Sequence, residues 1–431
     1  MTTETNTPTT SSHPVRKAAL VLAAAAALTA TGVSAAAATT DQPKPSGPGA
    51  PTVNDALQRE VARRVLEVGP PGYIARIDDG RRVHTYARGV ADRATGRRIT
   101  VRDQFEAGSN TKTFTAVLAL QQVDRRKLKL DAPVEKYLPG VVPNGENISV
   151  RMLLNHTSGL FSYTGDPDFF VGMENDPQHV YTDAELLAVA FRHEPYFAPG
   201  KGWQYSNTNY TLLGMILQKQ TGRSLPDLVR QRITGPLGLR HTYFADPRAT
   251  NTGPGYAHGY AIKFASGTPQ YTDVSSWPLG GWAGAAGAIV TTTSDLSRFF
   301  SAVLQGRLFS QEQLKQMKTT VPLPDGFPIK GGYGLGLFRT DSPCGTVWGH
   351  GGDTMGHHST AAATEDGRRV AVTDSTGEPN EATENPGVER YYRTILFGAD
   401  AVTVCQMLGK PVPSEVLDNL RGITPAPSAA K

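Results

Sequence analysis

The sequence predicts an α+β fold: an antiparallel sheet covered by helices, with a mainly helical domain inserted between two parts of the sheet domain. Strand-like runs occur near both ends of the chain, whereas helical spacing dominates its middle. The 431 residues, of which 39% are hydrophobic, suffice for one large domain or two closely packed ones. We place the sheet domain at residues 52–138 and 283–409 and the helical domain at residues 139–282.

The N-terminal elements follow from periodicity and turn chemistry. Residues 53–68 have helical spacing, and a two-residue turn at Asp79-Gly80 joins strands at 72–77 and 83–89. A helix at 111–123 is almost wholly apolar inside, as expected of a helix buried among other elements. Further helices are predicted at 150–154, 183–191, 210–221 and 225–233.

Strand patterns return after Gly287. A strand at 288–290 precedes a helix at 294–304, for which Ser294 or Asp295 is the predicted cap. A final helix is predicted at 388–396. The remaining strand-like runs are 333–338, 346–349 and 359–373, the last broken by a turn at Asp366-Gly367. We expect residues 410–431 to be a C-terminal tail that is partly disordered.

The first 38 residues have the composition of an export signal peptide. Arg16 and Lys17 precede an apolar stretch at 18–32, and small residues suited to cleavage follow near Ala35 to Ala38. The apolar stretch is shorter than the ~20 residues of a membrane span, so a retained anchor is the less favoured alternative. We expect residues 39–51 to be a linker and the mature protein to be secreted, extracellular or wall-associated, without a membrane anchor.

Composition also limits the partners. The net charge of +4 comes from 43 basic and 39 acidic residues without a long basic run, which argues against nucleic acid. Because an exported protein meets an oxidising environment, we expect Cys344 and Cys405 to form a disulfide, with two buried free thiols as the alternative. Such a bridge would clamp the strand before His350 to the C-terminal helix.

Ser109 and Lys112 are candidates for covalent catalysis. They lie three residues apart at a helix start, where such side chains share one face. An amine desolvated at a helix N-terminus loses basicity and can accept the serine proton, while the Ser109 N–H remains available to an oxyanion. The spacing alone is weak, because Ser428 and Lys431 repeat it in the tail. A helix cap is the alternative role for Ser109.

Two later motifs add polar groups. A phenol beside an ammonium ionises more easily, so Tyr205 can share a proton relay with the lysine, while Asn207 holds a substrate carbonyl or orients the lysine. The alternative is a buried tyrosine with a turn-forming asparagine. His350, Gly351 and Gly352 directly follow a predicted strand, where missing side chains let a substrate backbone approach. A bulge or turn is the alternative.

Together the motifs Ser-x-x-Lys, Tyr-x-Asn and His-x-Gly, in this order, resemble those of penicillin-recognising serine enzymes. The chain is most similar to secreted serine D-Ala-D-Ala carboxypeptidases, low-molecular-mass penicillin-binding proteins that are kin to class C β-lactamases and share the β-lactamase/transpeptidase-like fold. The resemblance covers nearly the whole chain after the linker. It is carried by Phe105-Glu-Ala-Gly-Ser-Asn-Thr-Lys112, Asn155-His-Thr-Ser-Gly-Leu160, Tyr205-Ser-Asn-Thr-Asn209, Tyr333-Gly-Leu-Gly-Leu337 and the two cysteines.

The resemblance implies a mechanism. Ser109 would be the nucleophile, with Lys112 and Tyr205 as its proton relay. Asn207 would bind the substrate amide, and the backbone N–H groups of Ser109 and Asp353 would form the oxyanion hole.

It also implies a substrate-binding cleft, to which His350, Gly351 and Gly352 would contribute. Trp282 resembles the aromatic wall of that cleft, with a core tryptophan as the alternative.

One departure concerns substrate choice. Several relatives that recognise a free carboxylate carry hydroxyl residues where this chain has Gly351 and Asp353. A substrate carboxylate beside Asp353 would be repelled unless Thr354 or Arg339 compensates. Similar His-Gly-Gly sequences occur in relatives that act as D-aminopeptidases, amidases or esterases.

We therefore expect a carboxypeptidase that acts on peptidoglycan stem peptides or another D-amino-acid acyl donor and is acylated by β-lactams. The alternatives are a class C-like β-lactamase, an esterase, a D-aminopeptidase or amidase, and a penicillin- or wall-binding protein without turnover. We expect a monomer that needs no cofactor. We expect no metal, because His357 and His358 point to opposite faces of a strand and lack further ligands at a useful spacing.

Overall fold

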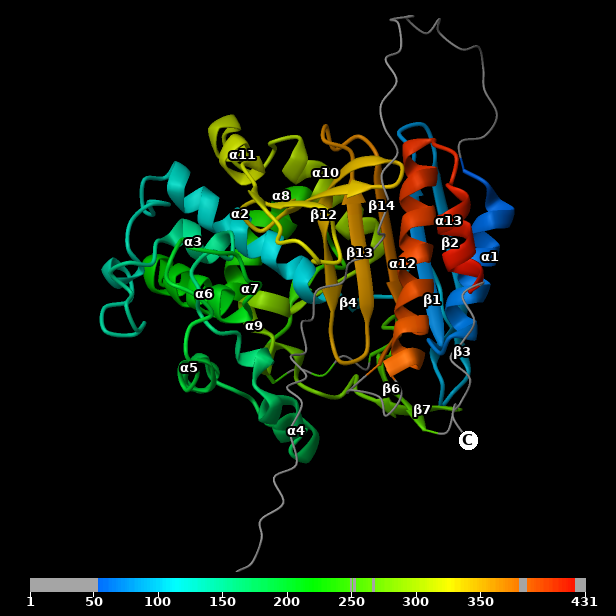
Figure 1. Cartoon of the computed structure of the whole chain (residues 1–431), viewed down its shortest axis with the longest axis horizontal. Helices are drawn as coiled ribbons and strands as arrows, with labels where there is room; N and C mark the ends of the chain where they lie inside the picture. The colour runs from blue at the N-terminus through cyan, green and yellow to red at the C-terminus, as the bar shows by residue number, and fades with distance from the viewer. Residues whose placement is uncertain (1–52, 249, 251–252, 266–267, 380–385, 423–431) are drawn as a thin grey trace, which may run out of the picture.

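A computed structural model describes residues 53–248, 250, 253–265, 268–379 and 386–422. The predicted signal peptide, the linker and the end of the tail, with its Ser428 and Lys431, lie outside these residues. The described chain forms a large antiparallel sheet with helices on both faces and a helix-rich region beside it, so the predicted α+β class is confirmed (Figure 1). The predicted domain boundaries remain a prediction.

The central sheet combines strands from the two ends of the chain. Its N-terminal strands are Gly72–Asp78 (β1), Val83–Asp92 (β2) and Arg97–Arg98 (β3). Its C-terminal strands are Val321–Pro322 (β9), Gly331–Tyr333 (β10), Phe338–Ser342 (β11), Gly345–Asp353 (β12), His358–Ala363 (β13) and Val370–Ser375 (β14). The order is β3-β2-β1-β14-β13-β12-β11-β10-β9, and antiparallel pairing of β1 with β14 joins the two parts.

Two three-stranded sheets complete the strand set among the described residues. Phe105–Glu106 (β4), Ile289–Thr291 (β8) and Tyr243–Phe244 (β5) form one. Gly377–Pro379 (β15), Tyr260–Ala265 (β6) and Thr268–Asp273 (β7) form the other, in which β15 runs parallel to β6. The region predicted to be mainly helical therefore also contains β5, β6 and β7.

Helices cover both faces of the large sheet. Asp55–Glu67 (α1), Pro386–Leu408 (α12) and Ser414–Arg421 (α13) pack together on one face, and Thr293–Leu304 (α10) lies on the other (Figure 1). Helix α12, which was predicted at 388–396, is therefore longer than predicted. Part of the predicted tail is helix α13, because its Val416 and Leu420 are buried against α1 and α12.

The remaining helices lie mostly in the inserted region. The buried helix predicted after Ser109 is Thr111–Asp124 (α2), and its Phe114 stacks on Phe299 of α10 with ring centroids 3.6 Å apart. The others are Val150–Leu154 (α3), Pro167–Asn175 (α4), Asp183–Phe191 (α5), Asn207–Thr221 (α6), Leu225–Val229 (α7), Gly235–Leu237 (α8), Gly284–Gly287 (α9) and Gln311–Lys318 (α11).

Three local predictions were wrong. The cap of α10 is Thr292, whose hydroxyl accepts the Asp295 N–H at 3.2 Å, rather than Ser294 or Asp295. The run 333–338 is the turn between β10 and β11 rather than one strand, and Gly336 at its centre has a left-handed φ of 71°. Strand β12 continues to Asp353, so the His-Gly-Gly motif lies within the strand rather than after it.

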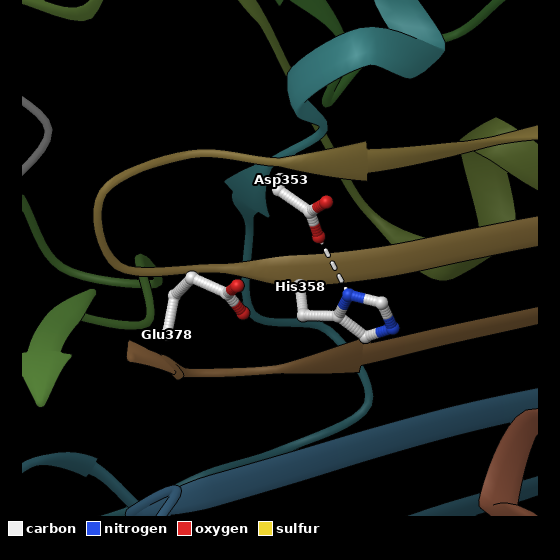
Figure 2. A group of neighbouring side chains, drawn as sticks. All are labelled: Asp353, His358 and Glu378. Atoms are coloured by element: carbon white, nitrogen blue, oxygen red, sulfur yellow. Dashed lines mark hydrogen bonds and ion pairs between the residues drawn. The ribbon is translucent and has the colours of Figure 1, made fainter. Parts of the chain in front are cut away.

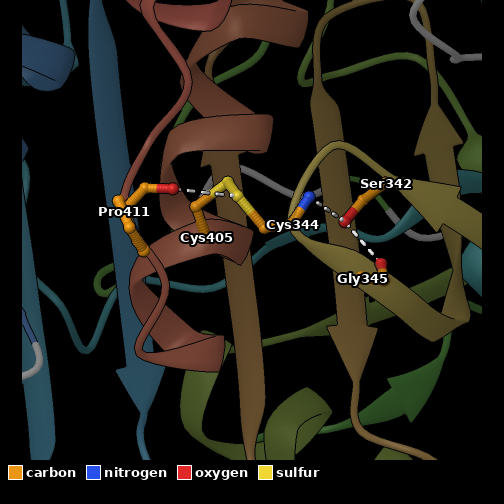
Figure 3. The surroundings of a disulfide bond; sticks show 5 residues. All are labelled: Ser342, Cys344, Gly345, Cys405 and Pro411. Atoms are coloured by element: carbon orange, nitrogen blue, oxygen red, sulfur yellow. Dashed lines mark hydrogen bonds between the residues drawn. A yellow bond between two sulfur atoms is a disulfide. The ribbon is translucent and has the colours of Figure 1, made fainter. Parts of the chain in front are cut away.

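The predicted disulfide is present. It joins Cys344, in the turn between β11 and β12, to Cys405 on α12 (Figure 3). The bridge therefore ties strand β12, which carries the third motif, to the C-terminal helix. None of the helices in the described part of the chain is long and apolar enough to cross a bilayer.

Candidate active site

The Ser-x-x-Lys motif places its two side chains in contact. Ser109 lies in the 3₁₀ turn Gly108–Asn110, immediately before α2, and Lys112 lies in the first turn of that helix. Lys112 Nζ is 3.0 Å from Ser109 Oγ, 2.7 Å from Asn207 Oδ1 and 2.9 Å from the Ala286 carbonyl oxygen. Ser109 is half-buried, whereas Lys112 is completely buried.

Burial holds the pKa of the Lys112 ammonium well below its usual value, because the charged form loses its hydration. A neutral amine has two N–H donors and one lone pair. Asn207 Oδ1 and the Ala286 carbonyl can each accept one donor, which leaves the lone pair for the Ser109 hydroxyl. The geometry therefore suits Lys112 as the acceptor of the serine proton.

Tyr205 lies just before α6 and faces the same lysine. Lys112 Nζ is 4.8 Å from the centre of the Tyr205 ring, and the phenol hydroxyl makes no hydrogen bond of ordinary geometry to the described residues. Burial raises the pKa of Tyr205 well above its usual value, and the nearby Ser109 hydroxyl offsets this only in part. Because burial also lowers the pKa of Lys112, it weakens the effect that a neighbouring ammonium would have on the phenol.

Asn207 is held at both ends of its amide. Its Oδ1 accepts from Lys112, and its Nδ2 donates to Thr164 Oγ1 at 2.9 Å. Of the two roles predicted for Asn207, orientation of the lysine is therefore the one that these contacts support.

The turn Gly108–Asn110, which carries the nucleophile Ser109 and is called the nucleophile turn below, makes close backbone contact with β12. A Cβ on Gly352 would lie 1.9 Å from the Ala107 carbonyl oxygen and 2.9 Å from Ser109 N. A Cβ on Gly108, whose φ is 50°, would lie 2.7 Å from the Asp353 carbonyl oxygen. Glycine at these two positions thus allows the backbone of Ser109 to approach that of Asp353, as an oxyanion hole formed by their N–H groups requires.

Two residues that sequence reasoning missed fix this contact. Asn110 Nδ2 donates to the Ala107 carbonyl at 3.1 Å and to Ser359 Oγ at 3.0 Å. Ser359 Oγ in turn lies 3.2 Å from the Gly352 carbonyl oxygen. Asn110 is the first variable residue of the Ser-x-x-Lys motif, but its partner is 249 positions away and no local pattern marks it.

A small pocket opens beside the nucleophile. Of the predicted site residues, Ser109, Asn207, Trp282 and Asp353 line it. Tyr163 fixes the aromatic wall by donating its hydroxyl to the Trp282 carbonyl at 2.9 Å. Other lining residues are Tyr163, Thr164, Phe170, Thr354, Met355, Glu378 and Arg393.

His350 and Gly351 line a different cavity, of about 330 Å³, between the sheet and α12. Burial lowers the pKa of His350 to about 3, and its Nε2 accepts the Tyr333 hydroxyl at 3.0 Å, so the imidazole is neutral. Thr354 and Arg339 were expected to compensate for the repulsion between Asp353 and a substrate carboxylate. Thr354 lines the Ser109 pocket. Arg339 does not line it and instead pairs with Asp341 on the same strand.

A cluster of charged residues that sequence reasoning missed lies at this pocket, which Glu378 and Arg393 line together with Asp353. Antiparallel pairing of β12 with β13 places His358 opposite Asp353, and His358 Nδ1 lies 2.6 Å from Asp353 Oδ1 (Figure 2). The other ring nitrogen of His358 is 3.2 Å from Asp400 Oδ2. Glu378, at the middle of β15, accepts from Arg393 at 2.9 Å. The folded hairpin brings His358 to Asp353, and α12 brings Asp400 to its other ring nitrogen.

The charged groups of this cluster shift one another's pKa values. Burial lowers the pKa of His358, but Asp353 and Asp400 outweigh it and hold that pKa well above its usual value. Burial raises the pKa of Asp353, but His358 outweighs it and the net shift is downward. The cationic imidazole therefore neutralises Asp353. Burial raises the pKa of Glu378 to about 7, although Arg393 acts in the opposite direction.

Metal binding by this cluster is disfavoured by its own chemistry. Among the described residues, Asp353, His358 and Glu378 form a group whose ligand atoms lie within 4.8 Å of one another, so the histidine does have acidic neighbours that its sequence spacing concealed. A metal would have to displace the proton shared with Asp353 and would face the guanidinium of Arg393. The absence of a metal stays a prediction.

The fold and this arrangement define a class of serine acyl-transfer enzymes. The family model described as Beta-lactamase matches residues 59–391, and the chain belongs to that family.

A D-stereospecific amidohydrolase from a Streptomyces species is 38% identical and superposes with a TM-score of 0.69 over 75% of this chain and 95% of the other. A D-amino acid amidase from Ochrobactrum anthropi SV3 is 28% identical, with a TM-score of 0.69 over 85% and 99% of the two chains. Penicillin-binding protein 4* of Bacillus subtilis (strain 168) is 29% identical over 76% of this chain and 72% of its own length. The relatives are thus serine hydrolases and penicillin-binding proteins with differing substrates.

Proposed function

We propose that this protein is a serine hydrolase that acts on amides, peptides or esters of D-amino acids through an acyl-enzyme on Ser109. The observation that carries the proposal is the buried Lys112, whose Nζ lies 3.0 Å from Ser109 Oγ and is held by two other oxygens. The D configuration of the substrate is inferred from the similarity to the D-stereospecific amidohydrolase and the D-amino acid amidase.

The reaction follows from the protonation states. Lys112 accepts the Ser109 proton as Oγ bonds to the substrate carbonyl carbon, and the N–H groups of Ser109 and Asp353 stabilise the oxyanion. When the tetrahedral intermediate collapses, the carbon–nitrogen bond breaks and the leaving amine takes a proton from the Tyr205 phenol, which the Lys112 ammonium then reprotonates. Water attacks the resulting ester, and free acid leaves with Ser109 restored.

A serine D-Ala-D-Ala carboxypeptidase of peptidoglycan stem peptides is the second candidate. The observation that favours it is Arg393, which lines the Ser109 pocket and whose guanidinium suits the carboxylate of a leaving D-Ala. Arg393 would then take the compensating role that was expected of Arg339. Acylation by β-lactams belongs to this candidate, because they imitate the D-Ala-D-Ala terminus.

One panel of substrates separates the candidates. We would measure hydrolysis of D-alanine p-nitroanilide, its L enantiomer, an acyl-D-Ala-D-Ala peptide, a short ester and a chromogenic cephalosporin, with wild type and Ser109→Ala. We expect preference for the D-amide and an acyl adduct on the Ser109 peptide by mass spectrometry. Retention of activity in Ser109→Ala would refute the proposal. Rapid turnover of the cephalosporin would favour a β-lactamase, and labelling by a fluorescent penicillin without any turnover would favour a binding protein.

We also propose that the protein is exported and acts as a monomer without cofactor or metal. Mass spectrometry of the secreted protein would locate its N-terminus, which we expect near Ala35 to Ala38. Light scattering during size-exclusion chromatography would give the oligomeric state. Full activity after dialysis against a chelator is expected, and its loss would contradict the last point.

A further inference from the structure

Glu378 has a buried oxygen without a partner beside the nucleophile. The residue is 3% exposed and lines the same pocket as Ser109. Its Oε1 accepts from Arg393 at 2.9 Å, whereas its Oε2 has no hydrogen-bond partner among the described residues. A buried carboxylate oxygen without a donor is costly, and such groups in a pocket mark a position where a ligand supplies the missing hydrogen bond.

Among the described residues, the charged groups at the pocket form ion pairs that use one oxygen of Glu378. Asp353 and Asp400 pair with His358, and Glu378 pairs with Arg393. Asp353 and Asp400 both contact His358, so their charges are stabilised within the protein. Glu378 is therefore the acid whose second oxygen is available to a cationic ligand.

We propose that Glu378 Oε2 binds the free α-ammonium of a D-aminoacyl substrate and so selects acyl donors whose amino group is unblocked. The inference deepens the proposed function and rests on it. An α-amino nitrogen is two bonds from the carbonyl carbon that Ser109 attacks, so it must enter the same small pocket, where Glu378 and Asp353 are the acidic residues that line the wall. An ammonium would complete the Glu378 hydrogen bonds, whereas a substrate carboxylate at the same position would face an unpaired anionic oxygen.

The experiment compares matched substrates that share one leaving group. D-Alanine p-nitroanilide carries the ammonium, and N-acetyl-D-alanine p-nitroanilide and propionyl p-nitroanilide lack it. In wild type we expect kcat/KM to be at least tenfold higher for the free amine than for either other substrate. In Glu378→Gln we expect that ratio to fall at least tenfold, with kcat/KM for the two uncharged substrates changed less than threefold.

Control variants separate recognition from structure. Glu365→Gln makes the same charge change at a side chain that is 73% exposed on the surface, and it should leave the ratio unchanged. Glu378→Asp keeps the charge and should retain part of the preference, which tests the proposal if Glu378→Gln does not fold.

An equal fall in kcat/KM for all three substrates in a folded Glu378→Gln protein would overturn the assignment. So would a wild-type preference for the blocked substrate. Failure of the proposed function has a different signature, namely no acyl adduct on Ser109 with any of the substrates.

Discussion

Substitution of Gly352 by alanine tests whether close contact between β12 and the nucleophile turn is required for catalysis. The added Cβ would lie 1.9 Å from the Ala107 carbonyl oxygen and 2.9 Å from Ser109 N, whereas real Cβ atoms essentially never approach closer than 3.0 Å. The two backbones must therefore separate by about 1 Å. Because a misplacement of about 1 Å in an active site can cost about 100-fold in rate, we expect the acylation rate to fall by about that factor.

The assay is the rate of acyl-enzyme formation, followed by stopped flow or by labelling with a fluorescent penicillin. Gly253→Ala is the matched control, because its Cβ would meet no atom within 4 Å, and we expect it to match wild type. Circular dichroism and thermal unfolding establish that the Gly352→Ala protein is folded. A folded Gly352→Ala enzyme with the wild-type acylation rate would show that the approach of β12 to Ser109 is not needed.

Three further predictions follow from the same geometry. Lys112→Arg should lower the acylation rate by at least about 100-fold, since a guanidinium stays protonated and cannot accept the serine proton; a wild-type rate would remove Lys112 from the mechanism. Replacing both Cys344 and Cys405, which are 61 residues apart, by serine should lower the free energy of unfolding by about 4 kcal/mol in urea titrations, and no loss would contradict the chain-entropy account. Because the pKa of folded His358 is raised, its stabilising effect is complete below the unfolded pKa of about 6.5 and is lost as pH rises through the folded pKa. His358→Gln should therefore destabilise the protein more at pH 6 than at pH 9, and the reverse order in chemical denaturation would refute the ion pair with Asp353.

The structural features that were predicted correctly from the sequence depend on short spacings or on composition. Ser109 and Lys112 are three positions apart, about one helical turn, so local geometry alone places the amine near the hydroxyl. The disulfide followed from two cysteines and an expected oxidising compartment. Periodicity failed where tertiary packing decides, as at residues 333–338, where Gly336 packs against Ala116 and Lys112 and turns the chain between two strands.

The charged residues at the Ser109 pocket could not be predicted from the sequence, because they come together only in the folded protein. Strand register places His358 opposite Asp353, and α12 then brings Asp400 to the second ring nitrogen. Glu378 and Arg393 follow β14, the last strand of the central sheet, and reach the pocket from β15 and α12. None of these residues has a spacing that marks a site, so the search for metal ligands by spacing around His358 could not find its acidic neighbours.

The opposite pKa shifts of Lys112 and Tyr205 support the roles that we propose for them. The sequence predicted a desolvated lysine that accepts the serine proton and a phenol that ionises more easily beside an ammonium. In the fold, burial acts on both side chains and favours the uncharged form of each. In the proposed mechanism, the resting site has a free amine as base beside Ser109 and an intact phenol as acid. Proton transfer from Ser109 to Lys112 would then create the ammonium only as the oxyanion forms, so that the new charge would stabilise the transition state rather than the resting enzyme.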